Sequence, residues 1–486
     1  MTFNSLAFLI FLPVVLAVWR VLPPKYRWAE LLLASYVFYA WFDALLLIPI
    51  LAITLISYAA ARGMGSVRSD GKRKALLFCT LAVCLGTLVA FKYLNFIVGL
   101  GYSIARFFGS DARFGGFDII LPMGISFYTF QTLSYVIDVY RGTVQAEKHY
   151  GYYSLFVVFF PQLVAGPIER PQNLIPQLKN AQNSSGNDIA LGVRKLATGF
   201  VKKIVISDFV ARFVDGAYSS SAAGGTAYAI ATALFAVQIY CDFSGYTDIA
   251  IGSARLMGIR LSENFDRPYS SISIREFWRR WHISLSSWFS DYLYKPLGGS
   301  RKGLFRQCVN IFIVFLCSGL WHGASLNFAV WGMLHGLFLI INTLYNAVKS
   351  KSVALERAAE RGWYKIAAHA LTLFAVWFAW IFFRAQTLTA ACAIVRDIFT
   401  DISFDVAVLT GLGIKSVELP LLFASLVLLS VIDDMPVINV RALPLGGATK
   451  QSGAALTYFA AAAAVAVLWL AALEYGNAGG FIYFRF

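Results

Sequence analysis

Apolar runs follow one another along almost the whole chain, separated by short polar segments. Their approximate bounds are 5–19, 31–60, 75–100, 119–137, 151–166, 196–214, 226–251, 307–320, 326–347, 366–383, 417–432 and 453–473. A helix needs about 20 apolar residues to cross the hydrocarbon core of a bilayer, so several of these runs are full spans and others are too short. The pattern predicts an all-α polytopic membrane protein with roughly 11 to 13 transmembrane and re-entrant helices.

Two of the runs contain residues that break helices. We expect the run 31–60 to form two short helices that break at Asp43 and Pro49, which leaves an even number of crossings between the basic segments on either side. In FFPQLVAGPIERP (159–171), the prolines and Gly166 predict a re-entrant segment rather than a straight span. This second break has either a functional or a merely architectural role.

The composition supports an integral membrane protein. Of the 486 residues, 58% are hydrophobic and only 14% are charged, and the mean hydropathy is +0.65. Soluble domains are about 45 to 50% apolar. No segment of 20 to 50 residues repeats, which argues against solenoids and inverted-repeat transporters. We therefore expect residues 1–486 to form a single integral membrane domain.

The formal net charge of +15 would suggest a nucleic-acid partner in a soluble protein. In a membrane protein, short loops rich in Lys and Arg stay on the cytoplasmic side, so we expect no nucleic acid here. The segments 62–74, 266–306 and 349–365 are all strongly basic and should face the cytoplasm. Basic residues follow the first apolar run and none precedes it, which places the N-terminus outside.

The six cysteines lie mostly in apolar runs, without a CxxC pattern or a histidine at metal-binding spacing. We expect the cysteines to be small buried hydrophobic residues, with neither a disulfide nor a metal site.

The segment 252–306 interleaves aromatic residues with Arg and Lys, as at a membrane interface, and is expected to form interfacial and re-entrant helices on the cytosolic face. A helix over Ile274–Ser286 would place Arg275, Arg279 and His282 on one face. Two interpretations stay open: a solvated amphipathic helix anchored by tryptophans, or a platform for an anionic ligand such as coenzyme A or a phosphopantetheine carrier. Pro296 with the two following glycines should end the next helix.

Five histidines are present. His149 and His369 lie at the ends of apolar runs and are most simply interface residues. His335 lies in WGMLHG, where Gly332 and Gly336 allow close helix packing, and is expected to be a structural hydrogen-bond partner.

His322 lies in LCSGLWHGASL (316–326), between two apolar runs that connect two predicted cytoplasmic loops. The first run has only 14 residues, a helix of about 21 Å, which predicts a turn within the membrane. An ionisable residue at that depth is costly and is a functional candidate. A buried neutral imidazole suits a general base that accepts a proton from a hydroxyl nucleophile. The alternative is a structural histidine bonded to a carbonyl group.

YCDFSGYTDIAIG (240–252) places Asp242 and Asp248 in an apolar run. Buried carboxylates need hydrogen-bond donors, and the two residues have either an architectural or a functional role.

Six ordered motifs together resemble the membrane-bound O-acyltransferase family, in its bacterial alginate O-acetyltransferase-like branch. They are GISFYTFQTLSYVIDVYRG (124–142), AGPIERP (165–171), DFSGYTDIAIG (242–252), NFDRPY (264–269), REFWRRWHISLSSWFSDYLYKPLGG (275–299) and GLWHGA (319–324). The similarity extends from SYVFYAW (35–41) to FIYFRF (481–486). It implies a ring of helices around a central funnel, with an acyl thioester entering from the cytoplasm and the acceptor from the other side.

The resemblance also implies roles for residues. His322 would be the catalytic base, and His282, in the WHIS motif, would line the cytosolic mouth. Trp321 would wall the site. The further candidates for substrate binding are Trp281, Arg279, Arg280, Lys295 and Asp242, of which the three basic residues would attract the donor phosphates. We expect no metal and no tightly bound cofactor, with acetyl-CoA or another acyl thioester as co-substrate.

The expected function is acyl transfer, with acetyl as the expected group, from a cytosolic thioester across the bacterial inner membrane to an extracytoplasmic polysaccharide. A periplasmic acetyltransferase is the expected partner protein, alongside membrane lipids. The acceptor polymer stays open among alginate, cellulose, peptidoglycan and others. No cysteine or serine has a clear base beside it, so direct transfer is the simpler expectation. The alternatives are a non-catalytic conduit or transporter that hands acyl groups to a periplasmic transferase, and a scaffold.

Overall fold

The computed structural model describes residues 1–111, 113–164, 166–180, 183–220, 223–402, 418–434 and 481. All regular elements within these residues are helices, which confirms the predicted all-α class. Six are long and apolar enough to cross a membrane, as expected of a polytopic protein: 44–66, 70–107, 225–256, 303–322, 326–349 and 362–384. Two shorter apolar helices, 6–21 and 420–430, accompany them. The run 453–473 lies outside the described residues.

The described chain divides into two compact units. The first comprises residues 1–197 and 246–262, and the second comprises the described parts of 198–245, 263–438 and 463–486. The single domain expected for 1–486 stays a prediction.

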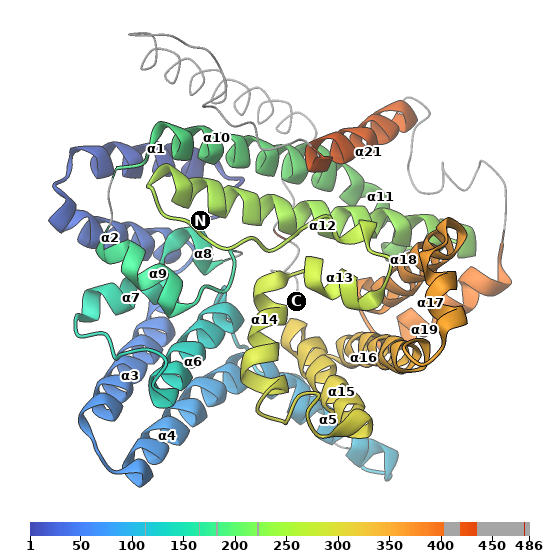
Figure 1. The fold of residues 1–486 in the computed structure, drawn as a ribbon, viewed down its shortest axis with the longest axis horizontal. Helices are drawn as coiled ribbons and strands as arrows, with labels where there is room; N and C mark the ends of the chain where they lie inside the picture. Colours follow the sequence, from blue (N-terminus) through green and yellow to red (C-terminus); the bar gives the residue numbers. More distant parts are fainter. Residues whose placement is uncertain are drawn as a thin grey trace. The chain divides into compact units, whose positions relative to one another are not determined.

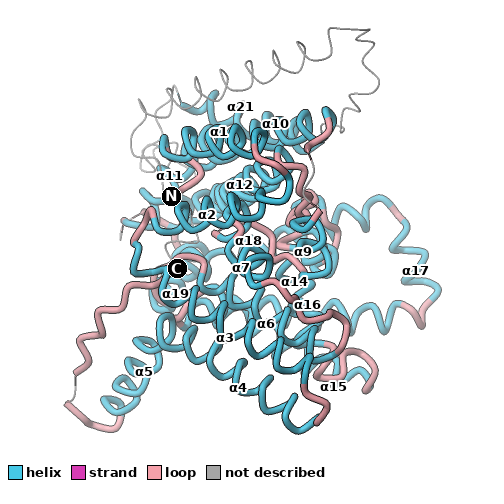
Figure 2. The backbone as a smooth tube through the Cα atoms, turned by 90° about the vertical axis from the view of Figure 1, so that its left-hand side faces the viewer, coloured by secondary structure: helices cyan, strands magenta, loops and turns pink. Residues whose placement is uncertain are grey.

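The first unit is a helical assembly in which α3, α4 and α6 lie side by side (Figures 1 and 2). Its elements are α1 (Leu6–Val21), η1 (Pro24–Tyr26), α2 (Arg27–Ala40), η2 (Ala44–Leu46), α3 (Leu47–Ser66), α4 (Asp70–Leu88), η3 (Val89–Tyr93), α5 (Leu94–Phe107), α6 (Ile125–Arg141), α7 (Tyr150–Val158), α8 (Phe160–Leu163), α9 (Pro171–Lys179) and most of α10 (Gly186–Phe200).

The predicted break in the run 31–60 is correct at one of its two residues. Helix α2 ends at Ala40, and the Asp43 carboxylate accepts a hydrogen bond of 2.8 Å from the Leu45 amide as the chain turns into η2. Pro49 does not break the chain, because it lies in the first turn of α3. A proline is tolerated there, since the first amides of a helix have no intrahelical acceptor.

FFPQLVAGPIERP does not form a straight span. Helix α7 stops at Val158, α8 has only four residues, and α9 begins at Pro171. Phe159 and Phe160 are fully buried, and the buried Glu169 accepts a 2.6 Å hydrogen bond from the Asn173 side chain and another from the Ser262 amide. The irregular backbone is therefore covered by protein. Ala165 of the motif lies outside the described residues.

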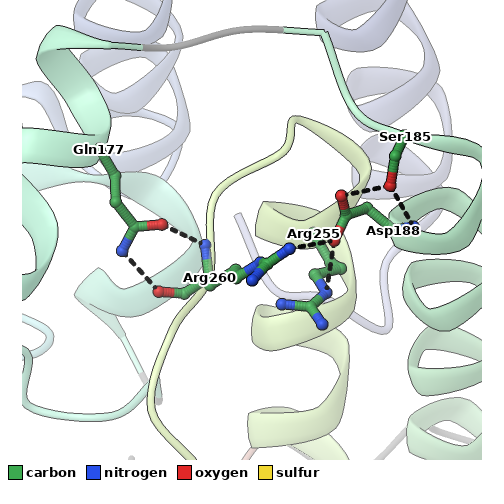
Figure 3. A network of polar contacts seen from close by, with 5 residues as sticks. All are labelled: Gln177, Ser185, Asp188, Arg255 and Arg260. Atoms are coloured by element: carbon green, nitrogen blue, oxygen red, sulfur yellow. Dashed lines mark hydrogen bonds and ion pairs between the residues drawn. The ribbon is translucent and has the colours of Figure 1, made fainter.

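A polar network holds the segment that follows α12 (Gly225–Leu256) in the first unit (Figure 3). The Asp188 carboxylate lies 3.2 Å from Arg255 Nε and 3.4 Å from Arg260 Nη2, and Ser185 donates its hydroxyl proton to the same carboxylate. The Gln177 side chain bonds both the amide and the carbonyl of Arg260, at 2.8 and 2.9 Å. These two arginines of the basic segment 252–306 therefore have structural partners.

The second unit carries the remaining elements and most of α12. They are η4 (Val201–Ser207), α11 (Asp208–Ser219), η5 (Pro268–Ser270), α13 (Ile274–Arg280), α14 (Ile283–Phe289), η6 (Ser290–Tyr294), α15 (Gly303–His322), α16 (Leu326–Lys349), α17 (Val353–Glu360), α18 (Gly362–Arg384), α19 (Leu388–Thr400) and α21 (Leu419–Asp434).

Helices α15 and α16 form a tight hairpin and lie side by side (Figures 1 and 2). A Cβ at Gly332 would lie 2.3 Å from the Phe315 carbonyl oxygen, and one at Gly319 would lie 2.2 Å from the Phe328 carbonyl oxygen. Only glycine permits this approach, as expected for Gly332.

The length predicted for the helix that precedes His322, 14 residues, is wrong. Helix α15 has 20 residues, from Gly303 to His322, a length of about 30 Å. Polar and basic residues of the first turns belong to the helix, although they do not belong to the apolar run. The helix is long enough to cross a bilayer core, so the inference of a turn within the membrane loses its basis.

Candidate active site

His322 is the last residue of α15 and lies in an aromatic cage of the second unit. Its imidazole is 3% exposed. The ring centroids of Trp321 and Trp331 lie 5.0 Å from that of His322, and the Phe383 ring lies 5.3 Å away. All three contacts are edge-to-face, the arrangement in which a positive ring edge meets a negative ring face. The cage fixes the imidazole plane and surrounds it with apolar rings.

His282 lies beside His322, with the two ring centroids 6.5 Å apart. It is fully buried, and Phe243 contacts its ring edge-to-face at 4.7 Å. Burial lowers the pKa of His282 to about 3, so this imidazole is neutral at physiological pH. The structure thus brings the two histidines together, although 40 residues separate them in the sequence.

The single helix expected over Ile274–Ser286 is wrong. Helix α13 ends at Arg280, and α14 begins at Ile283. Between them His282 adopts φ +44°, in the left-handed region that non-glycine residues seldom occupy. His282 therefore does not share a face with Arg275 and Arg279, and it points into the protein rather than to the surface.

Asn264 stabilises the break between α13 and α14 by capping the start of α14. Its backbone carbonyl accepts a 2.9 Å hydrogen bond from the Ile283 amide, and its side-chain oxygen accepts from the Ser284 amide at 3.2 Å and the Ser284 hydroxyl at 2.6 Å. These bonds satisfy first-turn donors of α14. The strain at His282 is thus offset by a cap that comes from a distant segment, a pattern typical of functional sites.

A pocket of about 290 Å³ lies among α13, α14, α15 and α16. Most of its lining is apolar or aromatic, and Arg275 and Arg279 are its charged lining residues. The Arg275 guanidinium donates a 3.1 Å hydrogen bond to Thr343 of α16. The full lining is Arg275, Trp278, Arg279, Leu285, Ser286, Phe289, Ser290, Tyr294, Gln307, Ile311, Val314, Phe315, Ser318, Leu339 and Thr343.

Two of the segments that line the pocket also carry the two histidines. On α15 a stripe of lining residues runs through Gln307, Ile311 and Ser318 at helical spacing, and the next position on that face is His322. Ser290 of η6 and Ser286 of α14 also line the pocket, and Ser286 lies one turn from His282. Neither histidine lines the pocket itself, but each lies four residues from a lining serine, His322 from Ser318 and His282 from Ser286. Between Gln307 and Ser318 the α15 stripe measures about 17 Å.

The other candidate residues lie in different places. Trp321 is 4% exposed beside both histidines, and Arg279 lines the pocket. Trp281 is buried between Phe277 and Trp380. Arg280 and Lys295 do not line the pocket: they form ion pairs of 2.7 Å with Glu276 and 2.6 Å with Asp291, each one helical turn away.

The carboxylates of α12 have the donors that burial demands. Asp242 lies 2.6 Å from Lys203 Nζ, and Asp248 lies 2.8 Å from Lys195 Nζ. The Lys203 ammonium also bonds Asp208 at 2.8 Å. Asp242 is thus paired inside the protein, and its neighbour Phe243 is the residue that contacts His282.

His335 is a hydrogen-bond partner, as expected. Its Nδ1 accepts from Trp278 Nε1 at 3.3 Å, and Trp278 in turn lines the pocket. Lys203, Trp331 and Phe383 escaped the sequence reasoning. A lysine in an apolar run was a usable signal for Lys203, whereas Trp331 and Phe383 are ordinary aromatic residues of apolar runs.

Comparisons with known proteins identify the family. The profile of the membrane-bound O-acyltransferase family matches residues 147–383, which contain both histidines and the whole pocket. The chain is 39% identical over 404 residues to the "probable alginate O-acetylase" of Pseudomonas putida, a match that covers 82% of this chain and 80% of the relative. The chain belongs to the membrane-bound O-acyltransferase family.

Other members of the family are similar over comparable lengths. A "probable alginate O-acetylase" of Azotobacter vinelandii is 36% identical, over 93% of this chain and 88% of the relative. The peptidoglycan O-acetyltransferase of Helicobacter pylori is 33% identical, over 75% of this chain and 72% of the relative. As a membrane-bound O-acyltransferase, the protein is a multi-pass membrane enzyme that transfers acyl groups.

Proposed function

We propose that this protein transfers an acetyl group from a cytosolic thioester, acetyl-CoA in the simplest case, for O-acetylation of an extracytoplasmic polysaccharide at the bacterial inner membrane. The observation that carries the proposal is the pairing of His282 and His322, with ring centroids 6.5 Å apart, one helical turn from residues that line a pocket. A largely apolar pocket beside two imidazoles suits a thioester whose reactive end must reach a base.

The pocket supports a donor that enters from the cytosolic side. Gln307 and Thr343 line it near the ends of α15 and α16 that adjoin the basic segments 266–306 and 349–365. The Arg275 and Arg279 guanidinium groups at this pocket suit the phosphates of coenzyme A. The pantetheine chain would lie along the apolar stripe, with the acetyl group at His322.

In the proposed reaction, His322 accepts the proton of the attacking hydroxyl as the hydroxyl oxygen bonds to the thioester carbonyl carbon. The C–S bond then breaks, and the proton passes to the departing sulfur as free thiol. His282, neutral and fully buried with its ring centroid 6.5 Å from that of His322, would contact the bound donor on that side. No metal or resident cofactor is required for these steps.

The names of the relatives support the acceptor class. They include acetylases of alginate and of peptidoglycan, both polymers outside the cytoplasm. We infer an acceptor polysaccharide on the far side of the membrane, reached through a periplasmic acetyltransferase as partner protein. Alginate is the first polymer to examine, because the two most similar relatives named above carry its name.

The test is alkali-releasable acetate on cell-surface polysaccharides, compared among cells that make wild-type protein, His322→Gln or Arg279→Met at matched membrane levels. His322→Gln should lower acetate on one polymer by at least about a hundredfold, the size of a general-base contribution. Arg279→Met should raise the donor KM in membrane vesicles and spare the maximal rate. Arg280→Met is the matched control, because Arg280 lies one residue away and does not line the pocket.

Unchanged acetate with His322→Gln would refute the assignment of the base. If vesicles of that variant still moved labelled acetyl groups across the membrane but formed no ester, the protein would be a conduit rather than the transferase.

A further inference from the structure

Trp331 has an unusual buried donor. Its side chain is fully buried, yet its indole Nε1 has no hydrogen-bond partner among the described residues. A buried N–H group without an acceptor destabilises the fold, so native proteins seldom keep one without a use. Two neighbouring tryptophans of the second unit differ in this respect: Trp278 Nε1 donates to His335 at 3.3 Å, and Trp380 Nε1 donates to the Tyr269 hydroxyl at 3.2 Å.

The position of Trp331 connects this donor to the site. Its ring centroid lies 5.0 Å from that of His322, with an interplanar angle of 84°. Trp331 also contacts Trp278, which lines the pocket, with ring centroids 5.8 Å apart. The indole of Trp331 thus lies between His322 and a residue of the pocket lining.

From this placement we propose that the Trp331 indole N–H binds the carbonyl oxygen of the acyl thioester and stabilises the negative charge that develops on it. The inference rests on the proposed acyl transfer. The hydroxyl oxygen attacks the carbonyl carbon, its proton passes to His322, and the electron pair of the C=O bond moves onto oxygen. The indole donates to that oxygen until the C–S bond breaks, the C=O bond re-forms, and His322 returns the proton to sulfur.

A donor fixed in an apolar cage suits this task. Phe383 and Trp380 pack against the Trp331 ring at 5.2 and 6.0 Å, so the ring is held by neighbours on several sides. In a site of low dielectric, a preoriented N–H stabilises developing charge more than water does, because no reorientation is needed during reaction. A neutral N–H group can therefore stabilise the oxyanion without a positively charged side chain beside it.

The decisive variant replaces Trp331 by β-(3-benzothienyl)alanine, in which sulfur stands for the indole N–H and the shape is kept. Labelled acetyl ester formation from acetyl-CoA is measured in inside-out vesicles from cells that make the full protein, together with the thermal unfolding of the purified protein. We expect the maximal rate to fall by about a hundredfold or more, with a donor KM within about threefold of wild type. The unfolding temperature should be unchanged or higher, because an unpaired buried donor is lost.

The same replacement at Trp377 is the matched control, since the Trp377 N–H donates to the Ala229 carbonyl at 3.2 Å and lies outside the cage around His322. It should lower the unfolding temperature and keep the rate within about threefold. The proposal is overturned if the Trp331 variant keeps its rate, or if its rate and unfolding temperature fall together as they would for a packing residue. Failure of the proposed function looks different: wild-type vesicles would then form no more ester than His322→Gln vesicles.

Discussion

The Lys203 ammonium should contribute more to stability than either of its carboxylate partners. Lys203 and Asp242 are 1% and 2% exposed with 2.6 Å between Nζ and Oδ1, whereas Asp208 is 19% exposed. In Lys203→Met, two carboxylates lose their common cation, and Asp242 has no direct access to water. Removing one member of a buried ion pair costs about 3 to 5 kcal/mol, because the remaining charge is left buried.

Asp242→Asn should cost less. Lys203 keeps its 2.8 Å contact with Asp208, and the asparagine oxygen still accepts a hydrogen bond. The loss is then that of a hydrogen bond to a charged group, about 1.5 to 3 kcal/mol. The double variant Lys203→Met/Asp242→Leu removes both buried charges and should be more stable than Lys203→Met alone, because well-packed apolar pairs replace buried ion pairs at little cost.

Thermal unfolding of the purified proteins in lipid nanodiscs measures this order. Lys203→Met should lower the unfolding temperature by about 3 to 5 °C, Asp242→Asn by less, and the double variant by less than Lys203→Met. The reasoning is refuted if Lys203→Met unfolds within about 1 °C of wild type, or if the double variant is the least stable of the three.

Two further predictions concern the backbone of the second unit. Gly332→Ala should lower both the unfolding temperature and the rate of acyl transfer, because its Cβ would clash with the Phe315 carbonyl oxygen. Gly86→Ala is the control: a Cβ there has nothing within 4 Å, so the change should be neutral or stabilising. Equal unfolding temperatures of the two variants would contradict the packing of α15 on α16. His282→Asn should unfold at a higher temperature than His282→Val, since both lose the ring contacts but only asparagine tolerates φ +44°. If the imidazole takes part in the reaction, the asparagine variant loses activity despite its intact fold, and full activity would reduce His282 to a structural residue.

The sequence predicted the features that depend on local pattern. Apolar runs predicted helices, Asp43 predicted a break, the two carboxylates of α12 predicted buried donors, and Gly332 predicted close packing. The errors arose where distant contacts override local preference. Pro49 was expected to break a helix, but it lies in the first turn of α3, where a proline disrupts no intrahelical hydrogen bond. The polar start of α15 looked like a loop because hydropathy ignores polar residues that a helix accommodates.

The largest error, at His282, shows what decides the site. Arg275, Arg279 and His282 have perfect helical spacing, and the helix stops between them because Asn264, eighteen residues before His282, supplies the cap that α14 needs. Without that cap the segment could continue as one surface helix, with the imidazole on the basic face. The break instead turns His282 inward to His322 and leaves Arg275 and Arg279 at the pocket. The break thereby separates His282 from Arg275 and Arg279. One segment can then supply an imidazole to the apolar surroundings of His322 and two cations to the pocket. That division is what a donor with an anionic nucleotide and a neutral thioester requires.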